Sequence, residues 1–114
     1  PGTAGSLYSA AANQLRIHAG TAQLATAGTS ALNTWYVWSA IFNGASSGLW
    51  QNGVSLIAAN AGANTTGGFT LGATTGGSVP EAQDVGEVLI YAAALGATDR
   101  QSVETYLNGR WAVY

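Results

Sequence analysis

The sequence predicts an all-β domain, an antiparallel β-sandwich that ends in one short α-helix. Residues 34–42 read TWYVWSAIF, and aromatic and β-branched residues of this kind are typical of strands. An Asn-Gly pair at 52–53 predicts a two-residue hairpin turn of type I′. After residue 98 the spacing of the apolar residues changes to that of a helix. Strands separated by turn residues favour a sandwich, with the helix packed on it.

Each predicted strand rests either on alternation of polar and apolar residues or on β-branched and aromatic composition. Residues 14–18 alternate, whereas residues 85–93 read VGEVLIYAA and are apolar on both faces. Turn-forming Gly, Asn, Ser and Thr lie between these runs. The predicted strands are 14–18, 22–27, 34–42, 47–51, 54–58, 69–72 and 85–93. The predicted loops are 1–12, 28–30, 43–46, 60–68 and 73–84.

The turn at 43–46 fixes how its two strands pair. A four-residue turn there places Ala40 opposite Leu49 and Ser39 opposite Trp50. One face of this pair carries Tyr36, Trp38, Ala40, Phe42 and Leu49, and the other face carries Trp35, Val37, Ser39, Ile41 and Trp50. The outer face of a sandwich is normally polar, so a second face this apolar is either covered or binds something.

The C-terminal segment predicts the helix. Its apolar residues recur at helical spacing and form one face, which we expect to pack on the sheets. These residues are Val103, Tyr106, Leu107 and Trp111. Thr98 is expected to cap the helix, with Gln101 three residues later completing a capping box.

Composition limits the partners. The chain has 114 residues, enough for one domain, and only 7% of them are charged. Its cations are Arg16, Arg100 and Arg110, too few for a phosphate-binding face, so nucleic acid is not an expected partner. No apolar run is long enough to cross a bilayer, and cysteine is absent. The bias toward Gly, Ala, Ser and Thr suggests an extracellular or virion-surface protein.

Three segments, taken in order, carry a family resemblance. They are TWYVWSAIFNG at 34–44, LWQNG at 49–53 and EVLIYAAALGATDRQSVETYLNGRW at 87–111. Together they resemble the laminin-G-like, concanavalin-A-like lectin and glucanase superfamily, whose domains are common in bacterial surface and phage tail proteins. The resemblance implies a jelly-roll sandwich. It also implies that the core face of the first hairpin is the one that carries Tyr36, Trp38, Ala40, Phe42 and Leu49. It spans 15–111 and lacks the family's usual N-terminal strands, so we expect 1–114 to be one such domain from a larger polypeptide.

The acidic residues do not have the spacing that hydrolysis needs. Hydrolases of this superfamily carry E-x-D-x-x-E on one strand, whereas this chain has Glu81, Asp84 and Glu87. On an extended strand Glu81 and Glu87 would lie about 20 Å apart, and glycoside cleavage needs carboxylates about 5 to 9 Å apart. His18 is the only histidine, and no G-x-S-x-G motif occurs. We therefore expect no enzyme activity, with a fragment of a glycan-cleaving enzyme as the alternative.

Calcium is the ion that the resemblance suggests, and the chain offers few ligands for it. Loop oxygens could come from Glu81, Asp84, Asn60 and Asn64, without the spacing of an EF-hand. One histidine and no cysteine cannot supply a usual zinc site. No cofactor is expected, and calcium stays open.

The aromatic residues indicate recognition or assembly. The tentative ligand-binding residues are Trp50, Tyr91, Trp35 and Asn64, because indole and phenol rings beside polar groups suit stacking on sugars. Cover by the chain's own loops, by its helix or by missing strands is the competing explanation for the apolar face. The expected function is a carbohydrate-binding or structural module of a surface or virion protein. A purely structural oligomerisation domain is the other alternative, because an edge without Lys invites pairing with sister chains.

Overall fold

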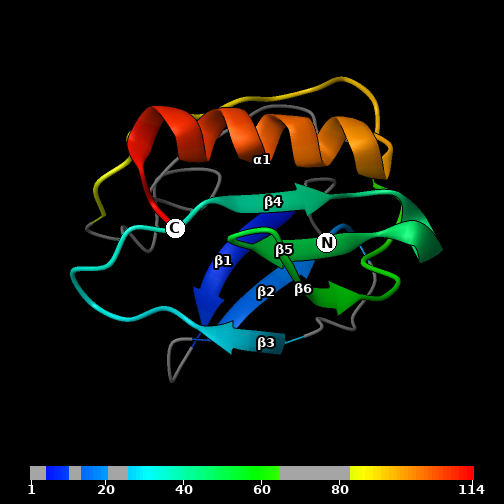
Figure 1. Cartoon of the computed structure of the whole chain (residues 1–114). Coiled ribbons are helices and arrows are strands. Elements are labelled where there is room, and N and C mark those ends of the chain that lie inside the picture. Colours follow the sequence, from blue (N-terminus) through cyan, green and yellow to red (C-terminus); the bar gives the residue numbers. More distant parts are fainter. Residues whose placement is uncertain (1–4, 11–13, 21–25, 65–82) are drawn as a thin grey trace.

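The computed structural model describes residues 5–10, 14–20, 26–64 and 83–114, and they form two small antiparallel sheets and one helix (Figure 1). The elements are β1 (Ser6–Ala10), β2 (Gln14–His18), β3 (Thr26–Thr29), β4 (Trp38–Ile41), the short 3-10 helix η2 (Gly44–Ser46), β5 (Gly48–Gln51), β6 (Val54–Ala58) and α1 (Ala97–Trp111). Each sheet has three strands in sequential order, β1-β2-β3 and β4-β5-β6.

The first sheet is built around β2, which the sequence predicted with the correct bounds. Its alternation turns Leu15 and Ile17 into the core, where both are fully buried. The expected loop at 1–12 is wrong, because Ser6–Ala10 pairs along the whole of β2 as β1. The turn expected at 28–30 is also wrong, because the strand β3 continues to Thr29.

The second sheet confirms the hairpin signals. Ala40 lies opposite Leu49 and Ser39 opposite Trp50, as the four-residue turn predicted. Asn52 and Gly53 both have positive φ, 51° and 77°, the backbone conformation of a type I′ turn. The strand predicted over 34–42 is shorter, since β4 covers only Trp38–Ile41.

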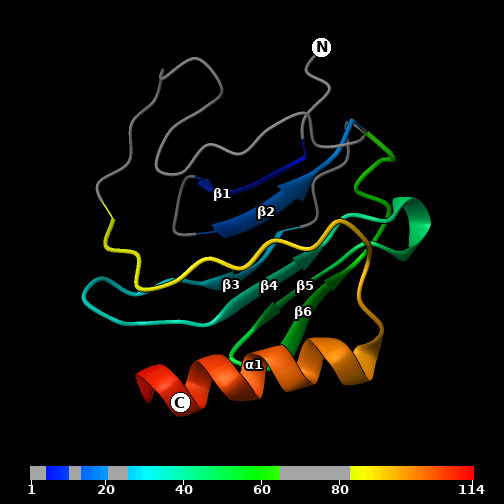
Figure 2. The ribbon, with the colours of Figure 1, turned by 90° about the horizontal axis from the view of Figure 1, so that it is seen from above.

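One core joins the two sheets. Its buried members are Leu15, Ile17, Ala19, Leu49, Ile57 and Ala61. Leu49 therefore faces the first sheet, while its neighbour Trp50 points to the opposite side of β5. Figure 2 shows the result as layers, with α1 on one side of β4–β6 and the strands β1 and β2 on the other.

The predicted jelly-roll sandwich, laminin-G or concanavalin-A-like, is wrong. A jelly roll needs about eight strands joined by Greek-key crossovers, whereas each sheet here has three strands in simple sequential order. The strand predicted over 85–93 is not a strand, and the one predicted over 69–72 lies outside the described residues. The described residues form a mixed arrangement of two small sheets and a helix, too small and sparse for a sandwich of that class.

The helix exists where the sequence placed it, but its cap and its buried face differ. Gly96 occupies the N-cap without a side-chain hydrogen bond, so the expected Thr98 capping box does not form. The buried residues of α1 are Arg100 and Glu104. Val103 and Leu107 are half-buried, while Tyr106 and Trp111 are exposed, so the predicted burial of Trp111 is wrong.

Two leucines provide a matched test of the shared core. Leu49 is fully buried and Leu32 is 87% exposed. We expect Leu49→Ala to lower the free energy of unfolding by about 2 to 5 kcal/mol, because it leaves a cavity between the sheets. Leu32→Ala should change it by less than about 0.5 kcal/mol. Urea titration followed by tryptophan fluorescence measures both, and equal effects would contradict a core at Leu49.

Candidate recognition surface

A buried ion pair fixes how α1 lies on the second sheet. The Arg100 and Glu104 side chains form the pair one helical turn apart, with exposed fractions of 8% and 4%. The Arg100 guanidinium lies over the Trp50 ring, 4.2 Å from its centroid. An aromatic face attracts a cation electrostatically, and this attraction is stronger away from water. The outer face of β5 is therefore occupied by the helix at Trp50.

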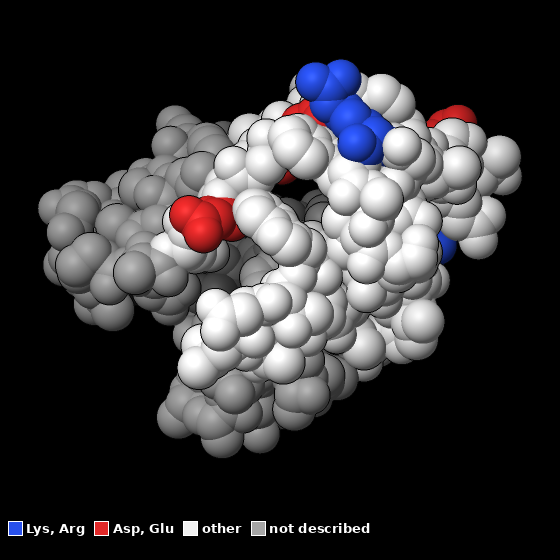
Figure 3. Space-filling model, turned by 60° about the vertical axis from the view of Figure 1, so that its left-hand side comes forward, with Lys and Arg blue, Asp and Glu red and all other residues white. Residues whose placement is uncertain are grey.

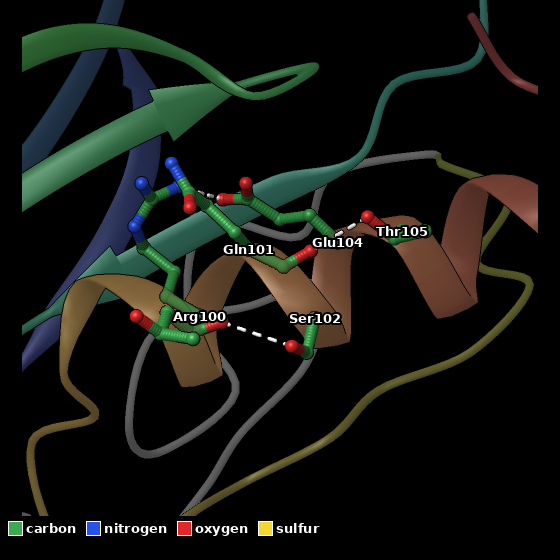
Figure 4. A network of polar contacts seen from close by, with 6 residues as sticks. Arg100, Gln101, Ser102, Glu104 and Thr105 are labelled. Atoms are coloured by element: carbon green, nitrogen blue, oxygen red, sulfur yellow. Dashed lines mark hydrogen bonds and ion pairs between the residues drawn. The ribbon is translucent and has the colours of Figure 1, made fainter.

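Figure 4 shows the two sides of this part of α1. The Arg100 and Glu104 side chains extend toward the sheet, whereas Ser102 and Thr105 lie away from it. The Thr105 hydroxyl donates to the Gln101 carbonyl at 2.8 Å, so its polar group is satisfied within the helix. The hairpin turn comes close to the pair, since a Cβ added at Gly53 would lie 3.8 Å from Glu104 Oε2.

A second carboxylate, Glu87, ties the 83–96 segment to the other end of α1. The Trp111 indole N–H donates to Glu87 Oε2 at 2.9 Å, and the Tyr106 hydroxyl donates to Oε1 at 3.2 Å. Arg110 Nε forms an ion pair with Oε2 at 3.1 Å. Tyr106, Arg110 and Trp111 all lie in the last six residues of α1, so the segment is held beside the C-terminal half of the helix.

The 83–96 segment runs along α1 in the opposite direction (Figures 1 and 2). A Cβ added at Gly86 would lie 3.4 Å from the Trp111 ring, so the absent side chain lets the backbone pass close to the indole. Within the described part of the chain, none of the hydrogen bonds uses a backbone group of residues 83–95. The segment is thus fixed by side chains and not by strand pairing.

An exposed surface results, which we call the apolar band. It consists of the large apolar side chains that the segment and the adjoining part of α1 leave exposed. These residues are Val85, Val88, Leu89, Ile90, Tyr91, Tyr106 and Trp111. Ile90 is the most exposed of them, at 65%. The sequence analysis expected residues 85–93 to form a strand and Trp111 to pack on the sheets, so it missed the band as one surface.

The four predicted ligand-binding residues are not brought together. Trp50 lies under Arg100, and Tyr91 belongs to the apolar band. Trp35 is 56% exposed in the stretch before β4. The backbone amide of Asn64 donates to the carbonyl of Ala19 at 2.9 Å and joins the chain after β6 to the end of β2. The four residues thus belong to four different parts of the chain, since Trp50 is on β5, Trp35 precedes β4, Asn64 follows β6 and Tyr91 is in the 83–96 segment.

The acidic and imidazole groups are dispersed. Asp84 is exposed and Glu87 is engaged by α1, while Glu81 lies outside the described residues. His18 is half-buried at the end of β2. Within the described ranges no three side chains of His, Asp or Glu come close enough to hold a metal ion. Of the calcium candidates, Asn60 uses its side-chain oxygen to accept from the Gly62 amide at 2.9 Å.

Among the described residues, no helix has the length and apolar character needed to cross a membrane. Comparison with protein-family models, curated proteins and solved structures gives no match for this chain.

The i,i+4 spacing of Arg100 and Glu104 is the sequence signal that could have corrected the predicted helix face. The two residues lie on the same side of the helix as Val103 and Leu107. An opposite-charge pair on that side offers a partner to a tryptophan ring, whereas apolar periodicity alone also includes Tyr106, which lies about 120° round the helix from Arg100.

The buried ion pair predicts unequal effects of two neutral substitutions. Glu104→Gln leaves the Arg100 guanidinium buried without a counter-charge, and we expect a loss of about 3 to 5 kcal/mol of stability. Asp84→Asn is the control, because Asp84 is exposed, and it should change stability by less than about 0.5 kcal/mol. Urea unfolding of both variants at one pH measures the difference. Similar values for the two would contradict the assigned role of the pair.

Proposed function

We propose that the chain is a non-catalytic assembly module, which docks a protein surface through the apolar band. One observation carries the proposal. Among the described residues, three large apolar side chains are less than 2% exposed, whereas eleven are at least 41% exposed. Seven of these eleven side chains belong to the apolar band. Soluble monomers rarely leave large apolar patches in water, and such patches mark interaction sites.

The composition of the band suits a protein interface. Its aliphatic residues offer no hydrogen bonds to a sugar, and its aromatic residues are of the kinds that are enriched at the centres of interfaces. Glu87, the charged group beside the band, is already paired with Arg110. Figure 3 shows how few charged atoms the described surface carries on one side of the molecule. Docking at this surface would therefore remove few charged groups from water without a partner.

The same pairing weakens the case for other partners. Arg100 is buried against Trp50, and Arg110 faces Glu87, which leaves little free positive charge for phosphate. Nor does the proposal need catalysis, because the Glu87 carboxylate already accepts from Trp111 and Tyr106. The setting that we propose is an extracellular or virion surface, where sister chains or the rest of a longer polypeptide would cover the band.

Cysteine labelling tests whether the band is an interface, and the natural chain has no cysteine to interfere. Ile90→Cys places a thiol in the band, and Val54→Cys places one at an equally exposed aliphatic position on β6. In the protein expressed from its complete reading frame, we expect a maleimide to react at least about tenfold more slowly with residue 90 than in the isolated chain at low concentration. The Val54→Cys control should react alike in both.

Equal reactivity of the two thiols in the complete protein would show an uncovered band and would overturn the proposal. Unfolding of either variant is checked beforehand by its melting curve, and both positions are exposed enough to accept cysteine.

Carbohydrate recognition is the second candidate function, favoured by two exposed rings. Tyr91 is 49% exposed and Trp35 is 56% exposed, so each can offer a ring face to a sugar. Trp50 does not add to them, because Arg100 covers it.

A glycan array followed by titration separates the two candidates. If a glycan binds, Tyr91→Ala or Trp35→Ala should weaken it about tenfold, and added salt should change the affinity little, because stacking is not screened. Leu32→Ala is the control, because the Leu32 side chain is also exposed but has no aromatic ring to stack on a sugar. Binding that is unchanged by both aromatic substitutions would remove these rings as the site.

A further inference from the structure

We propose that the partner of the apolar band is a second copy of this chain, and that residues 85–91 of the two copies pair as antiparallel strands. The inference rests on the proposed function, since it names the occupant of the same surface. It starts from the backbone of the segment. Among the described residues, no hydrogen bond satisfies the amides and carbonyls of residues 83–95 inside the chain. The sequence VGEVLIY over 85–91 has the residues that favour strands.

The segment lacks the features that block edge pairing. Soluble proteins protect open edges with Lys, Pro or inward charges. Residues 83–96 contain neither Lys nor Pro, and their charged groups are Asp84 and Glu87. Glu87 is directed to Trp111 and Arg110, so it does not repel the same residue of another copy. With a net charge of −2, whole chains repel each other little.

A second copy also fits the geometry. An antiparallel pair of identical segments has a two-fold axis, so each copy satisfies the backbone of the other and the assembly closes as a dimer. The side chains of α1 beside the segment, Tyr106 and Trp111, come into the same contact because Glu87 holds them against it. The band exposes roughly 700 Å² if a whole large side chain presents about 150 to 250 Å², close to the roughly 800 Å² per partner of a stable interface. Strand addition supplies main-chain hydrogen bonds in addition to this area.

Light scattering after size exclusion, over about 1 to 200 µM, tests the inference with the isolated chain. We expect twice the chain mass of 11.5 kDa at the upper concentrations. Ile90→Lys should raise the dimer dissociation constant at least about tenfold, because it adds a charge at the centre of the contact. Val54→Lys is the matched control, an aliphatic residue of 64% exposure on β6, and should leave the dimer intact.

Hydrogen exchange reports on strand pairing itself. The amides of residues 85–91 should exchange at least about tenfold more slowly at high than at low concentration, and Ile90→Lys should abolish the difference. A chain that stays monomeric, a dimer that loses equal affinity with Val54→Lys, or a dimer whose 85–91 amides remain open would overturn the inference. A monomeric chain whose residue 90 is still shielded in the complete protein would overturn the self-pairing alone and leave the assembly function standing.

Discussion

The contact of Arg100 with the Trp50 ring is the interaction on which the C-terminal half of the structure depends. At 4.2 Å from the ring centroid, the guanidinium fixes which side of α1 faces β4–β6. Glu104 lies beside Arg100 and supplies the counter-charge that the buried guanidinium needs. Tyr106 lies about 120° round the helix from Arg100, so this rotation directs it away from the sheets. Trp111 is the last residue of α1 and is 47% exposed, although it lies on the same side of the helix as Arg100.

The position of the 83–96 segment depends on Glu87. The Tyr106 hydroxyl and the Trp111 indole N–H are both near the C-terminal end of α1, and both donate to this carboxylate. Arg110 adds an ion pair, so one carboxylate is held by three side chains of α1. A hydrogen bond to a charged group is stronger than one between neutral groups, and several of them together hold a segment that has no strand pairing of its own. Because Glu87 is held against α1, the apolar residues beside it in the segment also lie along the helix and remain at the surface.

Local signals predicted the hairpin of the second sheet well. The turn residues at 43–46 and 52–53 dictate the register, and the observed pairing of Ala40 with Leu49 follows from chain geometry over a few residues. Residues 14–18 were equally clear, because strict alternation has one interpretation. By contrast, β1 consists largely of small residues, which resemble a loop in composition and form a strand here through pairing with β2. Pairing with a distant segment is a tertiary effect that composition does not contain.

The segment 85–93 and the helix face show the same limit at the candidate site. A run that is apolar on both faces of a would-be strand has the same sequence pattern in two cases: buried between sheets, or exposed as a segment without strand pairing. The outcome depended on whether a neighbouring strand was available, and a jelly roll would have needed several more. The helix face depended on Trp50, which lies fifty residues away from Arg100 in the sequence. Both misassignments moved large side chains from the expected core to the surface, and together they account for the apolar band.

The low charge of the chain connects the interior to the proposed interface. Two of its three cations, Arg100 and Arg110, hold α1 and the 83–96 segment in place through Glu104 and Glu87. Charges used in this way cannot also serve as the flanking charges with which soluble proteins keep exposed apolar strands apart. A chain with more surface charge could carry such a band as an isolated monomer, because repulsion would oppose association. In this chain the few ionic groups that fix the band in position are not available to protect it from association. A band covered by a partner is therefore the arrangement that fits both its contacts and its composition.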